Sequence, residues 1–384
     1  MRASRATIHL GNARHNLRVI REYLDRVSRS AGGRSPAMCV SVKANAYGHG
    51  AEELAKLAAE EGVDQLAVAT VDEAVRLRDA GVSAPMVLYS LSLPEEADEV
   101  CAAGLAPFVA DQEYCDRLAE AARRHHTTVA VHLKVDTGMG RIGCSPADAP
   151  VLARRIHDDP NLRLAGIATH FPVADDADRD FTEHQCRLFT EVVRRIRGSG
   201  VTDGLVHAAN SGAVLAYPEA WFDLVRPGIM VYGYYPSHDQ ARDLDLRPVM
   251  ELESRIVQLK TIEPGTSISY GRTYVAHRQT VIGTVPVGYA DGYNRLLSNC
   301  GSVLVWEDGD RRARRVPIAG RVCMDQIMLD LGPAAPTRKH DRVVLFGPDP
   351  RGPSAEEIAD LIGTIPYEVT CAVAGRVPRV YVDS

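Results

Sequence analysis

Along roughly the first two-thirds of the chain, short apolar runs alternate with segments that are apolar at helical spacing. Segments such as AEELAKLAAEEG and FTEHQCRLFTEVVRRIRGSG repeat apolar residues every three or four positions and close on glycine, which is typical of surface helices. The apolar runs are nearly continuous, which is typical of parallel strands covered by helices on both faces. The strands expected from this pattern span 37–44, 65–70, 85–90, 106–110, 128–135, 162–170, 205–210 and 222–228.

About eight β/α units within residues 1–244 match a closed (β/α)8 barrel, or TIM barrel, in length and number. An open doubly wound sheet is the competing fold. No GxGxxG sequence follows the first strand, so the chain lacks the most useful signature of that alternative. We therefore predict an α/β barrel over residues 1–244. The short strand ATIHL, within about 1–12, precedes the first barrel helix and could pair into either domain.

After about residue 245 the pattern becomes that of a β domain. Segments such as GSVLVWEDGD and DRVVLFGPD are short apolar runs bounded by glycine, proline and aspartate. Only SAEEIADLIG has helical spacing, and TIPYEVTCAVAGRVPRVYV has the β-branched and aromatic composition of strands. We predict a second, mainly β domain of sandwich or barrel type over residues 245–384.

Composition and charge narrow the functional classes. The chain has 384 residues, of which 45% are hydrophobic and 24% charged, as in ordinary globular proteins. Its formal net charge of −6 argues against general nucleic-acid binding, which needs a basic surface. The eight cysteines show no CxxC pair and no matching histidine spacing, so neither a metal site nor a disulfide framework is expected. No stretch has the pattern of a signal peptide or membrane span, and we expect a cytoplasmic protein.

Polar residues gather at the ends of the predicted strands, where barrel enzymes place their active sites. Strand one ends on Lys43, and strand five ends on Lys134 before the loop DTGMGRIG, which carries Arg141. Strand six ends on His170 and strand eight on Arg226. A desolvated lysine near a second cation has a lowered pKa and can attack carbonyl carbons. A lysine paired with a carboxylate across the barrel mouth is the alternative.

Other motifs favour a phosphate site and a candidate base. HAANSG supplies the Ser211 hydroxyl, and RPGIM supplies backbone N–H groups around Gly228 and Ile229, although simple turns have the same composition. DTGMGRIG lacks the GK(S/T) ending of a nucleotide loop, which favours a loop that holds Arg141 against an anion. Tyr270, in TSISYGRTY, needs nearby positive charge to act as a base near neutrality. A tyrosine that packs on a sheet is its alternative.

Taken together, these motifs resemble the alanine racemase family, whose members have fold type III and depend on pyridoxal 5'-phosphate. The matching segments, in the family's order and spacing, are VKANAYGHG, DTGMGRIG, THF, HAANS, VRPGI, SYGRTY, VPVGYADGY, GRVCMDQ, PYE and RVPRVY. The resemblance implies an N-terminal barrel and a C-terminal β domain that the N-terminal strand joins. It also implies a head-to-tail homodimer with shared active sites, which interconverts L- and D-alanine and supplies D-alanine for peptidoglycan.

The resemblance assigns the cofactor-binding residues. Lys43 would form a Schiff base with pyridoxal phosphate. The phosphate group would be held by Tyr47, Ser211, Gly228, Ile229 and Tyr367. Arg226 would meet the pyridine nitrogen, with His170 linked to it. A positive chain from Arg226 through His170 would help to lower the pKa of Tyr270.

The resemblance also assigns the substrate-binding residues and the bases. Arg141 would lie near the cofactor's phenolic oxygen and the substrate carboxylate, and Lys134 stands where many family members carry a carbamylated lysine (N6-carboxylysine). The partner chain would supply Tyr270, Tyr289 and the backbone N–H of Met324. Racemisation needs a base on each face of the α-carbon, and the family assigns the L face to Tyr270 and the D face to Lys43.

Three alternatives differ in chemistry. A racemase of the same fold could act on serine or on a broader set of amino acids, depending on the pocket around Tyr289, Tyr367 and Met324. An amino-acid decarboxylase shares the architecture but uses an acidic residue at the pyridine nitrogen, which Arg226 disfavours. Small barrel proteins that only bind the cofactor lack a counterpart of residues 245–384. Substrate range, the state of Lys134 and the physiological role stay open at this level.

Overall fold

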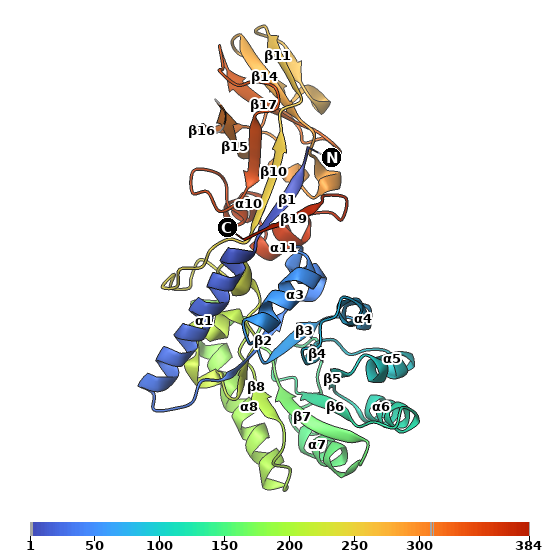
Figure 1. The fold of residues 1–384 in the computed structure, drawn as a ribbon. Coiled ribbons are helices and arrows are strands. Elements are labelled where there is room, and N and C mark those ends of the chain that lie inside the picture. The colour runs from blue at the N-terminus through green and yellow to red at the C-terminus, as the bar shows by residue number, and fades with distance from the viewer. Residues whose placement is uncertain (1–2, 308, 310, 384) are drawn as a thin grey trace.

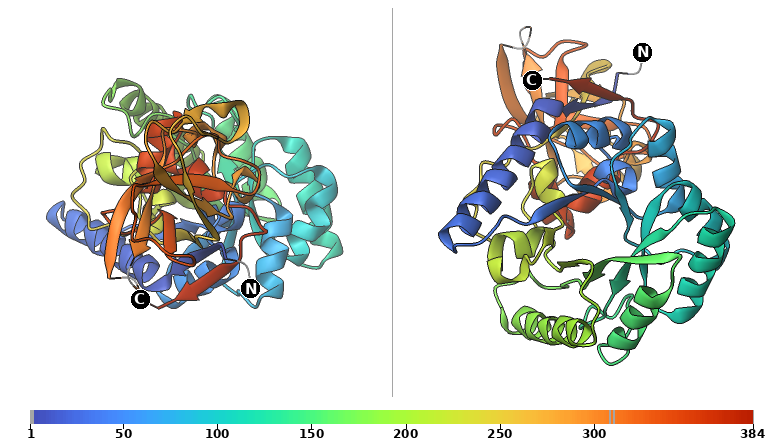
Figure 2. Two further views of the ribbon diagram at one scale, coloured as in Figure 1. Left: turned by 90° about the horizontal axis from the view of Figure 1, so that it is seen from above. Right: turned by 60° about the horizontal axis from the view of Figure 1, so that its bottom comes forward.

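The computed structural model describes residues 3–307, 309 and 311–383, which form two parts stacked on each other. The barrel lies at the bottom of Figure 1 and the β domain at its top. Seen from above in Figure 2 (left), the β domain lies over the barrel. No helix in the described ranges is long and apolar enough to cross a membrane.

The lower part is the predicted parallel barrel. Its eight strands follow the order β8-β7-β6-β5-β4-β3-β2-β9. They are β2 (Ala37–Ser41), β3 (Gln65–Val68), β4 (Met86–Leu88), β5 (Leu105–Val109), β6 (Val129–Lys134), β7 (Leu162–Ala168), β8 (Leu205–His207) and β9 (Leu224–Val225). The backbone N–H of Asp223 donates to Val206 O over 2.9 Å, and that of Arg226 donates to Ala209 O over 2.8 Å. These bonds bring the two terminal strands together, so the ring of strands is near-closed.

Helices cover the outside of the barrel: α1 leads from β1 into the first barrel strand, and each of the others lies between two successive parallel strands. They are α1 (Leu10–Ser30), α3 (Ala51–Glu60), α4 (Val71–Asp79), α5 (Ala97–Ala102), α6 (Gln112–Arg124), α7 (Ala149–Asp158), α8 (Asp180–Gly198) and α9 (Ser211–Ala216). The Asp111 side chain caps α6 by accepting a hydrogen bond from the Tyr114 N–H over 2.8 Å. In α8 the residues Phe189, Val192 and Ile196 recur at helical spacing and are buried.

The upper part is built from sheets in which all strand pairs but β1 with β19 are antiparallel. Its six-stranded sheet, in the order β16-β15-β18-β10-β1-β19, contains β1 (Arg5–His9), β10 (Met250–Arg255), β15 (Ser302–Glu307), β16 (Arg312–Pro317), β18 (Arg342–Phe346) and β19 (Arg379–Val382). A three-stranded sheet contains β11 (Gln258–Ile262), β14 (Thr280–Val285) and β17 (Ile327–Gly332), and β12 (Ser267–Ile268) pairs with β13 (Tyr274–Val275). Short 3₁₀ turns occur in both parts. Those of the barrel part span Pro94–Glu96, Pro218–Ala220 and Ile229–Tyr232, and those of the upper part span Tyr270–Arg272, Tyr289–Asp291 and Arg295–Leu297.

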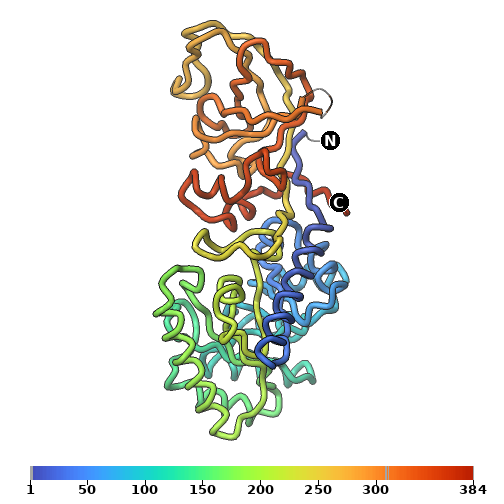
Figure 3. Tube along the Cα trace, turned by 90° about the vertical axis from the view of Figure 1, so that its left-hand side faces the viewer, coloured from blue at the N-terminus to red at the C-terminus, as the bar shows by residue number. Residues whose placement is uncertain are grey.

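The N-terminal strand belongs to the upper sheet, and the chain then passes through α1 into the barrel. β1 pairs antiparallel with β10 and parallel with β19. In Figure 3 the blue N-terminal segment accordingly runs beside the C-terminal segment. The first and last strands therefore lie side by side, and β10, the first strand of the second part after the barrel, lies on the other side of β1.

The C-terminal segment contains the clearest departure from the sequence expectation. Ser354 caps the predicted helix α10 (Ala355–Ile362) by accepting a hydrogen bond from Glu357 N–H over 3.1 Å. The following segment was expected to be strand material, but it contains a second helix, α11 (Pro366–Cys371). Pro366 at the first helical position starts it, because its fixed φ suits a helix and its missing N–H is not needed there. Only β19 at the end of the segment is a strand.

Candidate active site

A left-handed turn follows the first barrel strand and positions Lys43. The residues Ala44–Tyr47 all have φ between 52° and 54°, within the segment labelled α2 (Lys43–Tyr47). Each such residue costs about 1–2 kcal/mol, so a run of them needs support from its surroundings. The Glu73 carboxylate accepts the Ala44 N–H over 2.6 Å, and His49 Nδ1 donates to the carbonyls of Ala46 and Tyr47 over 2.9 and 3.0 Å. This support holds Lys43 at the end of the strand, at the barrel mouth.

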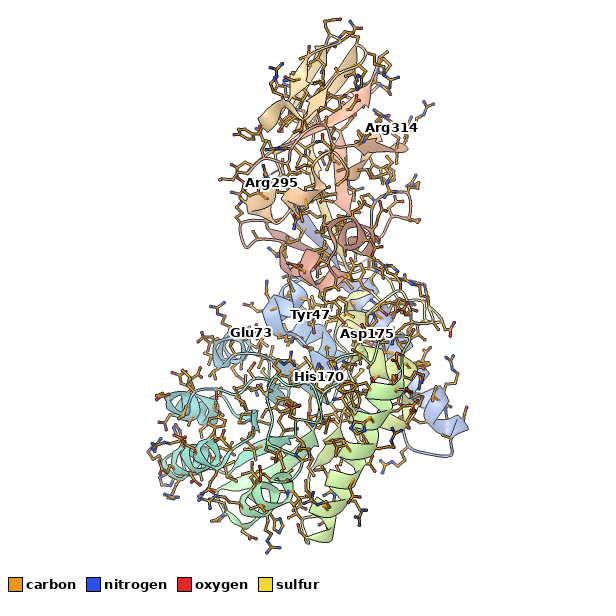
Figure 4. The ribbon with its side chains drawn as sticks, turned by 180° about the vertical axis from the view of Figure 1, so that it is seen from behind. Tyr47, Glu73, His170, Asp175, Arg295 and Arg314 are labelled. Atoms are coloured by element: carbon orange, nitrogen blue, oxygen red, sulfur yellow. The ribbon has the colours of Figure 1, made fainter. Side chains whose placement is uncertain are left out.

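A cavity of about 590 Å³ lies at the carboxyl ends of the barrel strands. Every cofactor-site residue predicted from the barrel lines this cavity, and so do Lys134 and Tyr367. The barrel residues are Lys43, Tyr47, Arg141, His170, Ser211, Arg226, Gly228 and Ile229. Figure 4 shows Tyr47 and His170 near the end of the barrel that faces the second domain. Residues separated by more than 300 positions thus share one wall.

The two lysines of the cavity are electrostatically destabilised as cations. Burial, followed by the nearby Arg141, lowers the pKa of Lys43, while Glu73 opposes the shift. Burial, followed by Arg226, lowers the pKa of Lys134 to about 7. The Lys134 Nζ donates to Val135 O over 3.0 Å, and no carboxylate among the described residues forms an ion pair with it. Both environments increase the share of neutral, nucleophilic amine.

Arg226 is a buried cation whose hydrogen-bond partners are all neutral. Its guanidinium donates to the carbonyls of Thr169 and Ala208, each over 2.8 Å. It also donates to His207 Nδ1 over 3.0 Å and to His170 Nδ1 over 3.2 Å. Since arginine has no acceptor, both nitrogens must be unprotonated there. This leaves an uncompensated positive charge beside the cavity.

His170 does not extend that charge. Burial, followed by Arg226, lowers the pKa of His170 well below its usual range, so the imidazole is neutral. The expected positive chain from Arg226 through His170 is therefore wrong in its second link. The positive charge stays on Arg226.

Hydroxyl and backbone donors form a small cradle in the cavity wall. The Gly228 N–H donates to Ser211 Oγ over 2.9 Å, and the Tyr47 hydroxyl lies 3.3 Å from Ser41 Oγ. A Cβ atom at Gly228 would come within 2.7 Å of Tyr47 Oη, so only glycine leaves this space open. Burial raises the pKa of Tyr47 to about 12, which keeps its hydroxyl protonated as a donor. The cradle has the donor set that a phosphate group requires.

Three predicted site residues of the second domain lie outside this cavity. Tyr270, Tyr289 and Met324 are 69%, 42% and 53% exposed. Tyr289 N–H donates to Cys323 O over 3.1 Å, and Ser269 Oγ donates to Arg321 O over 2.7 Å, so the segments that carry the three residues adjoin each other. One chain therefore presents them as an exposed group rather than in its own cavity.

Sequence reasoning missed several residues of the site. Glu73, which supports the left-handed turn, looks like any acidic residue in the first turn of a helix. His207 lies inside the HAANS motif but received no role. His132 stands two residues before Lys134 in the same strand, and that spacing places both on one face. This alternation was the available signal for a polar barrel interior.

The comparisons with known proteins agree over the whole chain. Residues 8–236 match a family model described as "Alanine racemase, N-terminal domain", and residues 249–381 match "Alanine racemase, C-terminal domain". An alanine racemase of Treponema denticola is 44% identical over 390 residues, covering 100% of this chain and 99% of the relative. "Alanine racemase 2" of Caldanaerobacter subterraneus subsp. tengcongensis is 42% identical over 386 residues, covering 100% and 95%.

Solved structures agree as well. The alanine racemase of Clostridium difficile 630 superimposes with a TM-score of 0.91 at 35% identity, covering 100% of this chain and 96% of that one. The alanine racemase of Bacillus anthracis with bound L-Ala-P gives a TM-score of 0.89 at 32% identity, covering 100% and 95%.

Proposed function

The chain belongs to the alanine racemase family, and on that premise we propose that it interconverts L- and D-alanine with pyridoxal 5'-phosphate as its cofactor. The observation that carries the proposal is the single cavity that joins Lys43, the donor cradle around Gly228 and the buried Arg226. Alanine is favoured over serine because the relatives and structures compared above carry the name alanine racemase.

The residues of the cavity fit pyridoxal phosphate. Lys43 has the depressed pKa that an amine needs in order to bond to an aldehyde. The phosphate would be held by Tyr47, Ser211, Gly228, Ile229 and Tyr367. Arg226 would donate to the pyridine nitrogen, and a guanidinium keeps its own proton. When bound, the cofactor withdraws electrons from the substrate's α-carbon and so acidifies the α-hydrogen.

The protein's part in the reaction is to hold the substrate and to move one proton on each face. Lys43 Nζ would serve the D face of the α-carbon, and Oη of the partner's Tyr270 would serve the L face. One base removes the proton while the other returns it, which inverts the centre. Arg141 would bind the substrate carboxylate, with Tyr289 and the Met324 backbone N–H contributed by the partner chain.

We propose a head-to-tail homodimer on the same grounds. The exposure of Tyr270, Tyr289 and Met324 supports an arrangement in which these side chains cover the barrel mouth of a second copy. The motif resemblance supports a cytoplasmic enzyme whose D-alanine enters peptidoglycan precursors. Each dimer would then contain two sites, and each site would need both chains.

Subunit complementation tests the proposal. Lys43→Ala removes the cofactor attachment and Tyr270→Phe removes the L-face base, so each variant alone should be inactive. Random mixing makes half of the dimers heterodimers, each with one intact site of two, so activity should recover to about a quarter of wild type. The assay is chiral chromatography of L-alanine incubated with the reconstituted protein.

Two outcomes contradict different parts of the proposal. Heterodimers purified through two affinity tags that stay inactive would contradict the shared sites but leave the racemase function intact. Wild-type protein that binds pyridoxal phosphate but converts L-serine or L-lysine faster than L-alanine would contradict the substrate. Protein that cannot be loaded with pyridoxal phosphate would contradict the whole assignment.

A further inference from the structure

Two imidazoles form a buried pair inside the barrel, next to Arg226. His132 Nδ1 and His207 Nε2 are 2.8 Å apart, and both side chains are fully buried. Gly166 on β7 makes this possible, because a Cβ there would lie 2.2 Å from His132 Nδ1 and 2.9 Å from His207 Nε2. The barrel interior therefore leaves space for this pair. Racemisation in the cavity that contains Lys43 does not by itself require such a pair.

Arg226 fixes the direction of the hydrogen bonds in this pair. Its guanidinium can only donate, so His207 Nδ1 accepts and His207 carries its proton on Nε2. His207 Nε2–H then donates to His132 Nδ1. His132 must therefore carry its own proton on Nε2. The chain of donors runs from Arg226 through both imidazoles and ends on the His132 Nε2–H.

That terminal donor has no partner among the described residues. His132 Nε2 is buried without a hydrogen bond, and so is Gln65 Oε1. Both residues line one cavity of about 880 Å³ at the amino ends of the barrel strands. This cavity lies at the opposite end of the strands from the one that contains Lys43. Because His132 Nδ1 is engaged by His207, the Nε2–H edge is the one left to face a ligand there.

The charges around His132 favour an anion. After burial, Arg226 and Arg163 are the causes that lower the pKa of His132 to about 3, which indicates positive potential at its ring. Arg163 is exposed and also lines the cavity. Two carboxylates also line the cavity, so the positive potential is local to His132 and Arg163: Asp203 lies 3.4 Å from His157 Nδ1, and Asp223 accepts the Val206 N–H over 2.7 Å.

We propose that this cavity is a second ligand site, which binds a small anion of the halide or short-carboxylate class through the His132 Nε2–H and Arg163. An acceptor at His132 would polarise the two imidazoles and strengthen the bond between His207 and Arg226, because hydrogen bonds in series reinforce one another. Occupancy of this site is thereby coupled to the residue that would meet the cofactor ring.

The test uses the enzyme loaded with pyridoxal phosphate and labelled with 15N at histidine. Bromide or formate is titrated at constant ionic strength against gluconate, a bulky anion, while the imidazole resonances are followed by NMR. We expect a saturable shift of the His132 Nε2–H resonance. Arg163→Gln should weaken the apparent affinity by about two- to fivefold, as expected for one exposed charge. His126→Gln, a change at an exposed histidine after α6, should leave the titration unchanged.

The variants separate this site from the active-site cavity. His132→Phe should abolish the saturable shift at the His207 resonance; if that variant does not fold, the Arg163→Gln titration decides. A shift that D-alanine competes away would place the anion beside Lys134 and Arg141 and overturn the proposal. A linear drift shared by all histidines would likewise overturn it, since it indicates no bound anion. No response of His132 to either anion would show that the cavity holds only water.

Discussion

Lys134 offers a quantitative test of the electrostatics of the active site. Only a neutral amine can attack carbon dioxide, forming an N–C bond and releasing a proton to give a carbamate. With a pKa of about 7, about 90% of Lys134 is neutral at pH 8. A lysine at the ordinary value of 10.5 would be only about 0.3% neutral at that pH. Burial therefore raises the reactive fraction about 300-fold at pH 8.

We therefore expect carbamylation of Lys134 to increase steeply between pH 6 and pH 8. At pH 6 about 10% of the amine is neutral, and protonation competes with carbamate formation. The new carboxylate would stand near Arg141, whose charge already acts on Lys134. An oriented Arg141 should bind the substrate carboxylate more tightly, so KM for alanine should rise as the carbamate is lost at low pH.

The assay is 13C NMR of protein equilibrated with 13C-bicarbonate at pH 6, 7 and 8. A carbamate resonance should grow with pH and should be missing from Lys134→Met, a substitution that keeps an unbranched side chain, shorter by the nitrogen atom alone. If no resonance appears at pH 8, or if it persists in Lys134→Met, the inferred shift in pKa is wrong. A KM that follows pH equally in both proteins would refute the link to Arg141.

Three further substitutions test the packing arguments. Gly166→Ala should lower the free energy of unfolding by about 1–3 kcal/mol in urea titrations because its Cβ overlaps both imidazoles, whereas Gly198→Ala, which has open space, should not. Gly228→Ala should weaken pyridoxal phosphate binding about tenfold or more by fluorescence titration, since its Cβ would stand 2.7 Å from Tyr47 Oη; equal affinity would remove the cradle from the site. Glu73→Gln leaves one oxygen for two backbone N–H groups, so the unfolding free energy should fall by about 1–3 kcal/mol, and an unchanged urea midpoint would contradict its support of the turn.

The positions of the strand ends could be predicted because a parallel barrel repeats the same strand pattern around its ring. Near-continuous apolar runs predicted its strands, and parallel strands bring their carboxyl ends to one mouth. Lys43, Lys134, His170 and Arg226 could therefore be grouped from the residue pattern alone. The same reasoning predicted a strand where the helix α11 lies. Its β-branched residues favour a strand, and the proline that starts the helix was given too little weight.

What the pattern could not predict depends on contacts between distant segments. The left-handed turn after Lys43 has alanines at positions that ordinarily avoid positive φ, and the carboxylate of Glu73 and the ring of His49 are among the groups that support it. The propensities of the turn residues do not encode the support from Glu73, because that residue belongs to another helix, 29 positions away from Ala44.

Arg226 shows why the chemistry of the site follows from such distant contacts. A buried guanidinium ordinarily needs a carboxylate, and a sequence does not reveal which groups surround it. Here two carbonyls and two imidazoles orient Arg226 without cancelling its charge. Burial, followed by this retained charge, lowers the pKa of both Lys134 and His170, so one amine becomes nucleophilic and one imidazole stays neutral. Replacing either imidazole, His170 or His207, with a carboxylate would therefore alter the lysine as well as the arginine.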